Sequence, residues 1–181
     1  VRNGHDETCV TVEATADGVA LSMAPALVEF ASPDGLKPGD EGEGTLDAAS
    51  GFCETIRNIV RADQCDRDGG LSPRGVMARF SEAQGHLWAM LDAPRAWRRE
   101  TNLATATLDY QLRYGAKPEA GTQVKLMTGI AGASAKTIRF RHWLFDAETD
   151  ELVAAAAGAA LFIDRATRKA IALPPKVAEA A

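Results

Sequence analysis

One amphipathic helix limits what this chain can fold into. Between Ser72 and Pro94, apolar residues recur at intervals of three or four positions, at Val76, Phe80, Ala83, Leu87 and Leu91. This spacing puts them on one face of a helix of about five turns. Ser72 can cap the first turn, and Pro73 suits the first helical position. A helix with so broad an apolar face needs a sheet to cover it.

The segments on either side of this helix alternate with a period of two, as β-strands do. One precedes the helix and four follow it, at residues 53–60, 104–114, 122–130, 135–146 and 151–163. The alanine-rich residues 151–160 are also compatible with a helix, because alanine favours helix over strand. In 135–146, His142 shares a face with Phe140, which favours a partly buried structural histidine. The order predicts an α+β domain in which an antiparallel sheet wraps around one long helix.

The first 51 residues differ in composition from the rest. Residues 9–14 and 19–23 flank an Ala-Asp-Gly turn and predict a β-hairpin, and residues 31–51 are rich in Gly, Pro and acidic side chains, as a linker is. We therefore divide the chain into an N-terminal hairpin and linker (1–51), one domain (52–175) and a C-terminal tail (176–181).

Composition excludes several classes of function. The net charge of −5 argues against nucleic acid as a partner, because phosphate binding needs a basic surface. No apolar stretch is long enough to span a membrane. The three cysteines have no metal-ligand spacing and indicate reduced thiols, so we expect a cytoplasmic protein without a metal or cofactor.

Several segments, in this order, carry a resemblance to a known family. They read "VRADQCDRDGGLSPRGVMARFSEA", "TLDYQLRYGAKPEAGTQVKL", "GASAKTIRFRHWLFD" and "LVAAAAGAALFIDRATRKAIALP". Together they resemble hotdog-fold thioesterases of the 4-hydroxybenzoyl-CoA thioesterase-like superfamily. The sequence departs from the family pattern at Gly70, where many members have histidine, at Val76, where many have tyrosine, and at Gln64, which replaces the first aspartate of the usual pair.

The resemblance implies hydrolysis of an acyl-CoA or acyl-carrier thioester. This reaction needs a carboxylate and fixed donors for the developing oxyanion, and the N-terminus of a helix offers unpaired N–H groups. The family alignment favours Asp66 as the carboxylate, with Asp68 as the rival. The main-chain donors would come from Gly70, Leu71, Ser72 and Gly75, since Pro73 has no N–H. For both aspartates, the alternative is that they only shape a turn.

Further candidates are weaker. Glu82 is a second-line catalytic carboxylate, although a solvated glutamate on the helix surface is the favoured interpretation. Arg74, Lys136 and Arg139 could bind the phosphates of coenzyme A, and Met77 could line an acyl pocket. The resemblance also implies a homodimer or higher homo-oligomer. The alternative to an enzyme is a hotdog domain that binds an acyl or aromatic ligand, or serves as an assembly module, without catalysis.

Overall fold

The computed structural model describes residues 15–16, 19–20 and 52–181, and the chain divides into two units, 1–45 and 46–181. In the first unit, β1 (Thr15–Ala16) pairs antiparallel with β2 (Val19–Ala20). β2 lies within the predicted second strand of the hairpin, residues 19–23. The remainder of the predicted hairpin and the predicted linker up to residue 51 lie outside the described residues.

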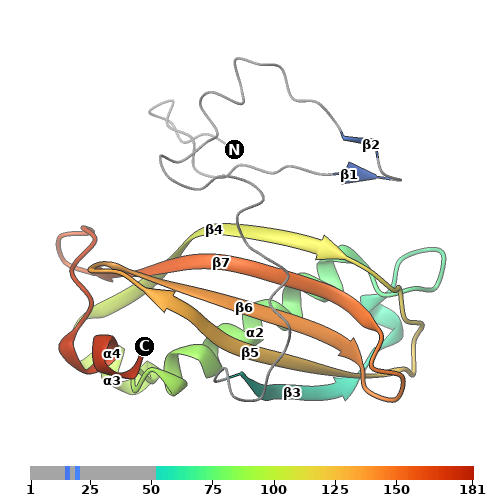
Figure 1. The fold of residues 1–181 in the computed structure, drawn as a ribbon, viewed down its shortest axis with the longest axis horizontal. Helices are drawn as coiled ribbons and strands as arrows, with labels where there is room; N and C mark the ends of the chain where they lie inside the picture. Colours follow the sequence, from blue (N-terminus) through green and yellow to red (C-terminus); the bar gives the residue numbers. More distant parts are fainter. Residues whose placement is uncertain (1–14, 17–18, 21–51) are drawn as a thin grey trace. The chain divides into compact units, whose positions relative to one another are not determined.

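The second unit is built on one antiparallel sheet with the strand order β3-β5-β6-β7-β4 (Figure 1). The five strands are β3 (Cys53–Ile59), β4 (Leu103–Tyr114), β5 (Gln123–Ala133), β6 (Thr137–Asp146) and β7 (Leu152–Asp164). All five strands expected from the period-two pattern are present, with ends that differ by a few residues. In this sheet β3 and β4 are the edge strands.

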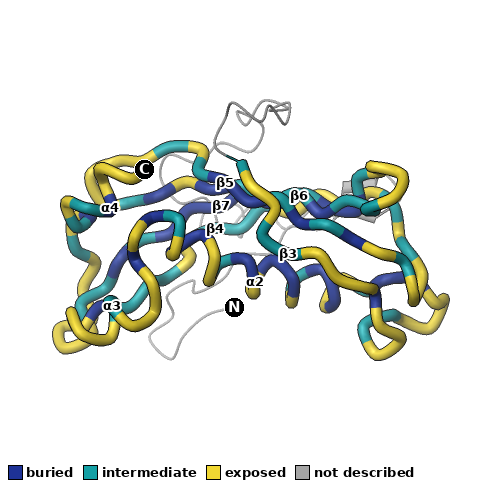
Figure 2. Tube along the Cα trace, turned by 90° about the horizontal axis from the view of Figure 1, so that it is seen from below, coloured by how far each residue is buried: buried dark blue, intermediate teal, exposed yellow. Residues whose placement is uncertain are grey.

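The long helix α2 spans Pro73–Met90, as the apolar spacing predicts. The Ser72 hydroxyl accepts a hydrogen bond from the N–H of Gly75 at 3.1 Å, which confirms the predicted cap. Every residue of the predicted apolar stripe is at most 2 % exposed: Val76, Phe80, Ala83, Leu87 and Leu91. Figure 2 shows this alternation of buried and exposed residues along α2.

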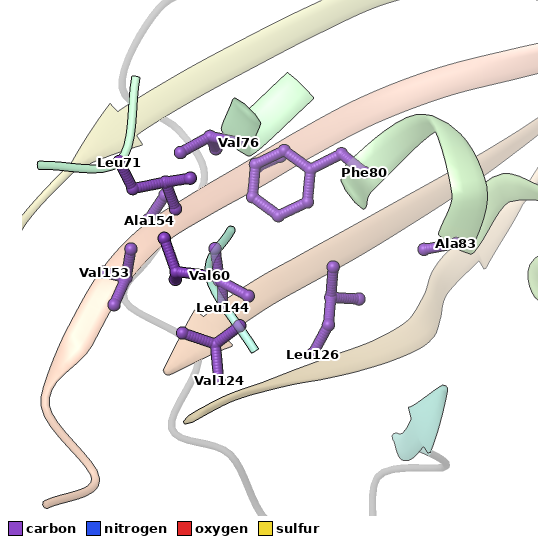
Figure 3. Close-up of a cluster of buried hydrophobic side chains, with 11 residues drawn as sticks. Val60, Leu71, Val76, Phe80, Ala83, Val124, Leu126, Leu144, Val153 and Ala154 are labelled. Atoms are coloured by element: carbon purple, nitrogen blue, oxygen red, sulfur yellow. The ribbon is translucent and has the colours of Figure 1, made fainter. Parts of the chain in front are cut away.

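Two apolar clusters join α2 to the sheet. In the first, Val76, Phe80 and Ala83 of the helix lie against side chains of β5, β6 and β7 (Figure 3). In the second, Leu87, Trp88 and Leu91 lie against residues of β4, β6 and β7. Burying a large apolar side chain stabilises the folded state by about 1.5–3 kcal/mol, so this face holds the helix on the sheet.

The alanine-rich segment is a strand, and the helical alternative for 151–160 is wrong. From Ala154 to Ala160, β7 pairs with β4 on one side and with β6 on the other. A Cβ at Gly158 would lie 2.5 Å from the ring of Phe140, which shows how closely neighbouring strands approach this segment. Pairing on both sides therefore outweighs the helical preference of alanine.

Two short helices that the sequence pattern did not predict lie at one end of the sheet (Figure 1). They are α3 (Arg95–Glu100) and α4 (Pro175–Ala180). Val177 of α4 is fully buried in the second cluster. The Lys176 ammonium lies 4.0 Å from the centre of the Trp97 ring, so the last residues are packed against α3.

Candidate functional site

The two candidate aspartates lie in a closed turn between β3 and α2. The Asp66 N–H donates to the Gly70 carbonyl at 3.0 Å, and the Gly69 N–H donates to the Asp66 carbonyl at 3.1 Å. Gly69 has a φ of 87°, a conformation that favours glycine. Gly69 therefore permits the turn itself. Gly70 instead makes room for a lysine side chain, Lys117.

Lys117 joins the two aspartates. It lies in the loop between β4 and β5, and its Nζ is 2.7 Å from Asp66 Oδ2 and 2.5 Å from Asp68 Oδ2. A Cβ at Gly70 would lie 2.6 Å from Lys117 Cγ, so the absence of a side chain at Gly70 makes room for the lysine. Lys117 was not among the residues predicted from the sequence, because nothing near it in the sequence distinguishes it from other surface lysines.

Backbone hydrogen bonds hold the Lys117 loop against the aspartate turn. The Leu71 N–H donates to the Pro118 carbonyl at 2.8 Å, and Gly70 forms an antiparallel bridge with Glu119. These contacts fix the two residues that follow Lys117, Pro118 and Glu119, against the aspartate turn. The two loops form one structure at the N-terminus of α2.

The two carboxylates have different environments. Asp68 Oδ1 accepts a hydrogen bond from the Gly70 N–H at 3.1 Å, while its Oδ2 faces Lys117. Hydrogen bonds with Asp66, with Lys117 and with the Gly70 N–H hold the pKa of Asp68 well below its usual value. The Asp66 side chain is 35 % exposed and that of Asp68 is 66 % exposed. Within residues 52–181, the Asp66 carboxylate accepts no backbone N–H. Asp68 is thus tied to the turn by its backbone contact, and Asp66 is held by side chains alone.

All four expected oxyanion donors already have acceptors within the chain. The N–H groups of Leu71 and Ser72 donate to the carbonyls of Pro118 and Gln64, at 2.8 and 3.0 Å. The Gly75 N–H donates to the Ser72 hydroxyl, and the Gly70 N–H to Asp68. Only the acceptor at Gly70 is an exposed side chain that can move aside.

The first turn of α2 has one more N–H, that of Arg74. In the described part of the chain, it has no hydrogen-bond acceptor. The Arg74 side chain is exposed at the start of the helix. From the sequence, Arg74 was predicted only as a phosphate ligand through its guanidinium group. Its main-chain N–H was not among the predicted oxyanion donors.

A buried arginine fixes the helix start to β3. Arg79 is 1 % exposed and donates to the Gln64 side chain at 2.9 Å and to the Ile59 carbonyl at 3.3 Å. Burial lowers the pKa of Arg79. A Cβ at Gly75 would lie 2.7 Å from the Gln64 carbonyl oxygen, so Gly75 allows this close approach. Gln64, which replaces a family aspartate, therefore has a structural role here.

The remaining predicted residues are not all brought together. Glu82 is exposed on α2, and Met77 is half-buried against the first cluster. Lys136 and Arg139 are exposed at the β5–β6 turn, the far end of β5 from the Lys117 loop. Eleven strand residues separate these two ends, which corresponds to roughly 34 Å. Within one subunit, these two cations are therefore remote from Asp66.

In the part of the chain that the structure describes, no group of three His, Cys, Asp or Glu side chains could hold a metal ion. None of the helices described is both long enough and apolar enough to cross a membrane.

Comparisons with known proteins place this chain in a family. Residues 60–181 match the family model described as the thioesterase-like superfamily. No curated protein sequence matches the chain. Solved structures match with TM-scores of 0.60 to 0.66, at identities of 11–20 % that show the fold alone.

Three of these structures illustrate the likeness. A 1,4-dihydroxy-2-naphthoyl-CoA thioesterase from Synechocystis is 18 % identical, with a TM-score of 0.63, over 72 % of this chain and 95 % of that chain. A DHNA-CoA thioesterase from Staphylococcus aureus is 19 % identical, with a TM-score of 0.64, over 71 % and 87 %. A hypothetical protein from Staphylococcus aureus, in complex with CoA, is 15 % identical, with a TM-score of 0.65, over 69 % and 78 %. The expected hotdog fold is confirmed.

Proposed function

Because the chain belongs to the thioesterase-like superfamily, we propose that it hydrolyses acyl-CoA thioesters at the turn between β3 and α2. The observation that carries the proposal is the Asp66 carboxylate, held by Lys117 beside the start of a capped helix. The positive end of the helix dipole favours the negative charge that develops on a thioester oxygen. Asp66 is the reacting carboxylate, and Asp68, which is bound to the backbone, supports it.

The carboxylate can act in two ways. As a general base, Asp66 takes a proton from water, and the hydroxide attacks the carbonyl carbon. As a nucleophile, it attacks the carbon itself and forms an anhydride that water then cleaves. In both routes, the C–S bond breaks, the CoA thiolate takes a proton, and the products are a carboxylic acid and free CoA.

The oxyanion would be stabilised by main-chain donors at the helix start. The Arg74 N–H has no acceptor among the described residues and is the available donor, while the Gly70 N–H stays bound to Asp68. Leu71, Ser72 and Gly75 remain engaged, so we do not assign them as donors.

An apolar surface beside this turn suits an acyl group. Leu112 and Tyr114 on β4 are 37 % and 49 % exposed. They pair with Ala156 and Ala154, which are buried in the first cluster, so they lie on the side of the sheet that faces the helix. Half-buried Met77 packs against the same cluster.

A panel of acyl-CoAs with short, long and aromatic acyl groups, followed with a thiol reagent, tests the proposal. The wild-type protein should release free CoA, and Asp66→Asn should lower kcat by about 100-fold or more. Asp63→Asn is the matched control, because Asp63 is an exposed aspartate nearby whose partner is Arg61. Unchanged turnover in Asp66→Asn would remove Asp66 from the mechanism.

The alternative function is a domain that binds an acyl or aromatic ligand without catalysis. The N–H groups of Gly70, Leu71, Ser72 and Gly75 are all engaged within the chain, which favours this alternative. The same panel separates the two functions. Acyl-CoA binding, measured by calorimetry, without release of CoA for any acyl group would favour the binder.

We further propose that two copies associate through β4. This strand is an edge of the described sheet and exposes Leu108, which is 54 % exposed, together with Leu112 and Tyr114. A long apolar edge invites pairing with another chain. Leu108→Lys should shift the protein from dimer to monomer in light scattering, and a wild-type monomer would contradict the proposal.

A further inference from the structure

Lys117 has the contacts expected of a residue that holds a catalytic carboxylate in place. Its ammonium group lies 2.7 Å from Asp66 and 2.5 Å from Asp68. We propose that Lys117 is a positioning residue, which fixes the Asp66 carboxylate at the start of α2 and is itself anchored by Asp68. The inference rests on the proposed thioesterase function and deepens it.

The stem of Lys117 packs against the backbone at Gly70. Exposed ion pairs usually contribute little, because two long side chains lose freedom when they pair. Here the stem of Lys117 packs over Gly70, where a Cβ would come within 2.6 Å of its Cγ. The next residue, Pro118, accepts the Leu71 N–H at 2.8 Å. The fold has therefore already restricted the lysine before it contacts the aspartates.

The contacts form a chain from the backbone to Asp66. The Gly70 N–H holds Asp68 Oδ1 at 3.1 Å, Asp68 Oδ2 holds Lys117, and Lys117 holds Asp66. Hydrogen bonds to Asp66 and then to Asp68 raise the pKa of Lys117, so the ammonium stays charged. The Asp66 carboxylate accepts no backbone N–H among residues 52–181, so its orientation depends on this series of contacts through Lys117 and Asp68.

Misplacement of a catalytic group by about 1 Å can lower the rate by about 100-fold. Lys117→Met keeps a stem of similar length and removes the charge, so kcat should fall by about 10- to 100-fold with KM little changed. Lys117→Arg restores a cation that can bridge two carboxylates and should recover most of the activity. A purely structural role would not produce this rescue or this separation of kcat from KM.

Gly70→Ala is an independent variant, because it pushes the Lys117 stem aside without changing a charge. It should lower kcat in the same direction as Lys117→Met. Thermal unfolding of each variant checks that the fold is intact.

An NMR titration tests the contacts without any substrate. The Asp68 carboxyl carbon should titrate at a higher pH in Lys117→Met than in the wild type, because a hydrogen bond that lowers the pKa of Asp68 is lost. An unchanged Asp68 titration would overturn the anchoring.

The kinetic outcomes separate this inference from the proposed function. Active wild-type protein with wild-type kcat in Lys117→Met overturns the role of Lys117 and leaves the thioesterase proposal standing. Wild-type protein that hydrolyses no acyl-CoA overturns both, because a positioning residue needs a reaction to serve.

Discussion

The Nδ1 atom of His142 lies 2.9 Å from the hydroxyl of Thr128, inside the core between sheet and helix. The other ring nitrogen, Nε2, lies 3.2 Å from the side-chain nitrogen of Gln84. An amide N–H can only donate, so Nε2 is the acceptor and Nδ1 carries the proton. The histidine is therefore neutral and donates to Thr128. The Thr128 hydroxyl in turn lies 2.9 Å from the hydroxyl of Thr55, which extends this series of hydrogen bonds.

We expect His142 to make the protein sensitive to acid. Burial lowers the pKa of His142 from 6.5 to about 4. Between these values, the unfolded chain takes up a proton that the folded chain does not, so stability falls as the pH falls from about 6.5 to 4. The shift corresponds to about 3 kcal/mol. Urea unfolding at pH 7 and at pH 4.5 measures the loss.

His142→Gln is the control for this effect. Glutamine can form hydrogen bonds but does not titrate, so the variant should lose about 2 kcal/mol less than the wild type between pH 7 and pH 4.5. Carboxylates that are stabilised in the folded protein, such as Asp146 and Asp164, contribute equally to both proteins and cancel in the difference. Equal acid losses in the two proteins would show that His142 does not titrate as proposed.

The hydroxyl of Tyr110 should contribute little to stability. The hydroxyl and the Gln84 Oε1 atom are buried, and neither forms a hydrogen bond of good geometry in the described part of the chain; the Gln84 side chain only opposes part of the rise that burial causes in the pKa of Tyr110. Burial raises the pKa of Tyr110 to about 12. Removing an unpaired buried polar group relieves its desolvation cost, so Tyr110→Phe should leave the free energy of unfolding unchanged or raise it by about 1 kcal/mol.

Thr128→Val is the contrasting substitution for Tyr110→Phe. It conserves shape but leaves the His142 N–H without an acceptor, so it should destabilise the protein by about 1–3 kcal/mol. Chemical denaturation compares the two variants. A loss in Tyr110→Phe as large as that in Thr128→Val would show that Tyr110 has a partner, such as a bridging water.

Two glycines of α2 should respond to alanine with opposite signs. A Cβ at Gly85 meets nothing within 4 Å, so Gly85→Ala should stabilise the protein by about 1 kcal/mol through helix propensity. A Cβ at Gly75 would lie 2.7 Å from the Gln64 carbonyl and 2.6 Å from a Leu71 methyl group, so Gly75→Ala should destabilise it. Thermal unfolding gives both signs, and stabilisation by Gly75→Ala would mean that the turn can relax.

Much of the fold could be predicted because it follows local periodicity. The stripe from Val76 to Leu91 indicated the helix, and alternation in 135–146 placed His142 on the inner face. The pattern predicted a strand at 151–163 but left a helix open for Ala154–Ala160, because alanine favours a helix and only pairing with two neighbouring strands decides. It also missed α3 and α4, which are too short to show a repeat.

The candidate site was only half predictable. Asp66 and Asp68 stand beside the helix start in the sequence, so a motif can reveal them. Lys117 is 49 residues from Asp68, in a loop without periodicity, and nothing local marks its charge as different from that of other lysines. The N–H groups of Leu71 and Ser72 are engaged by the carbonyls of Pro118 and Gln64. Pro118 reaches the helix start only after the strands have paired.

The order of residues alone determined the helix, its cap and four of the five strands, because each depends on neighbours a few positions away. Only the tertiary structure decided that Lys117 stands between the two carboxylates and that β7 is a central strand. Those features depend on groups that are distant along the chain, and antiparallel pairing of β3 with β5 and of β4 with β7 brings them into contact.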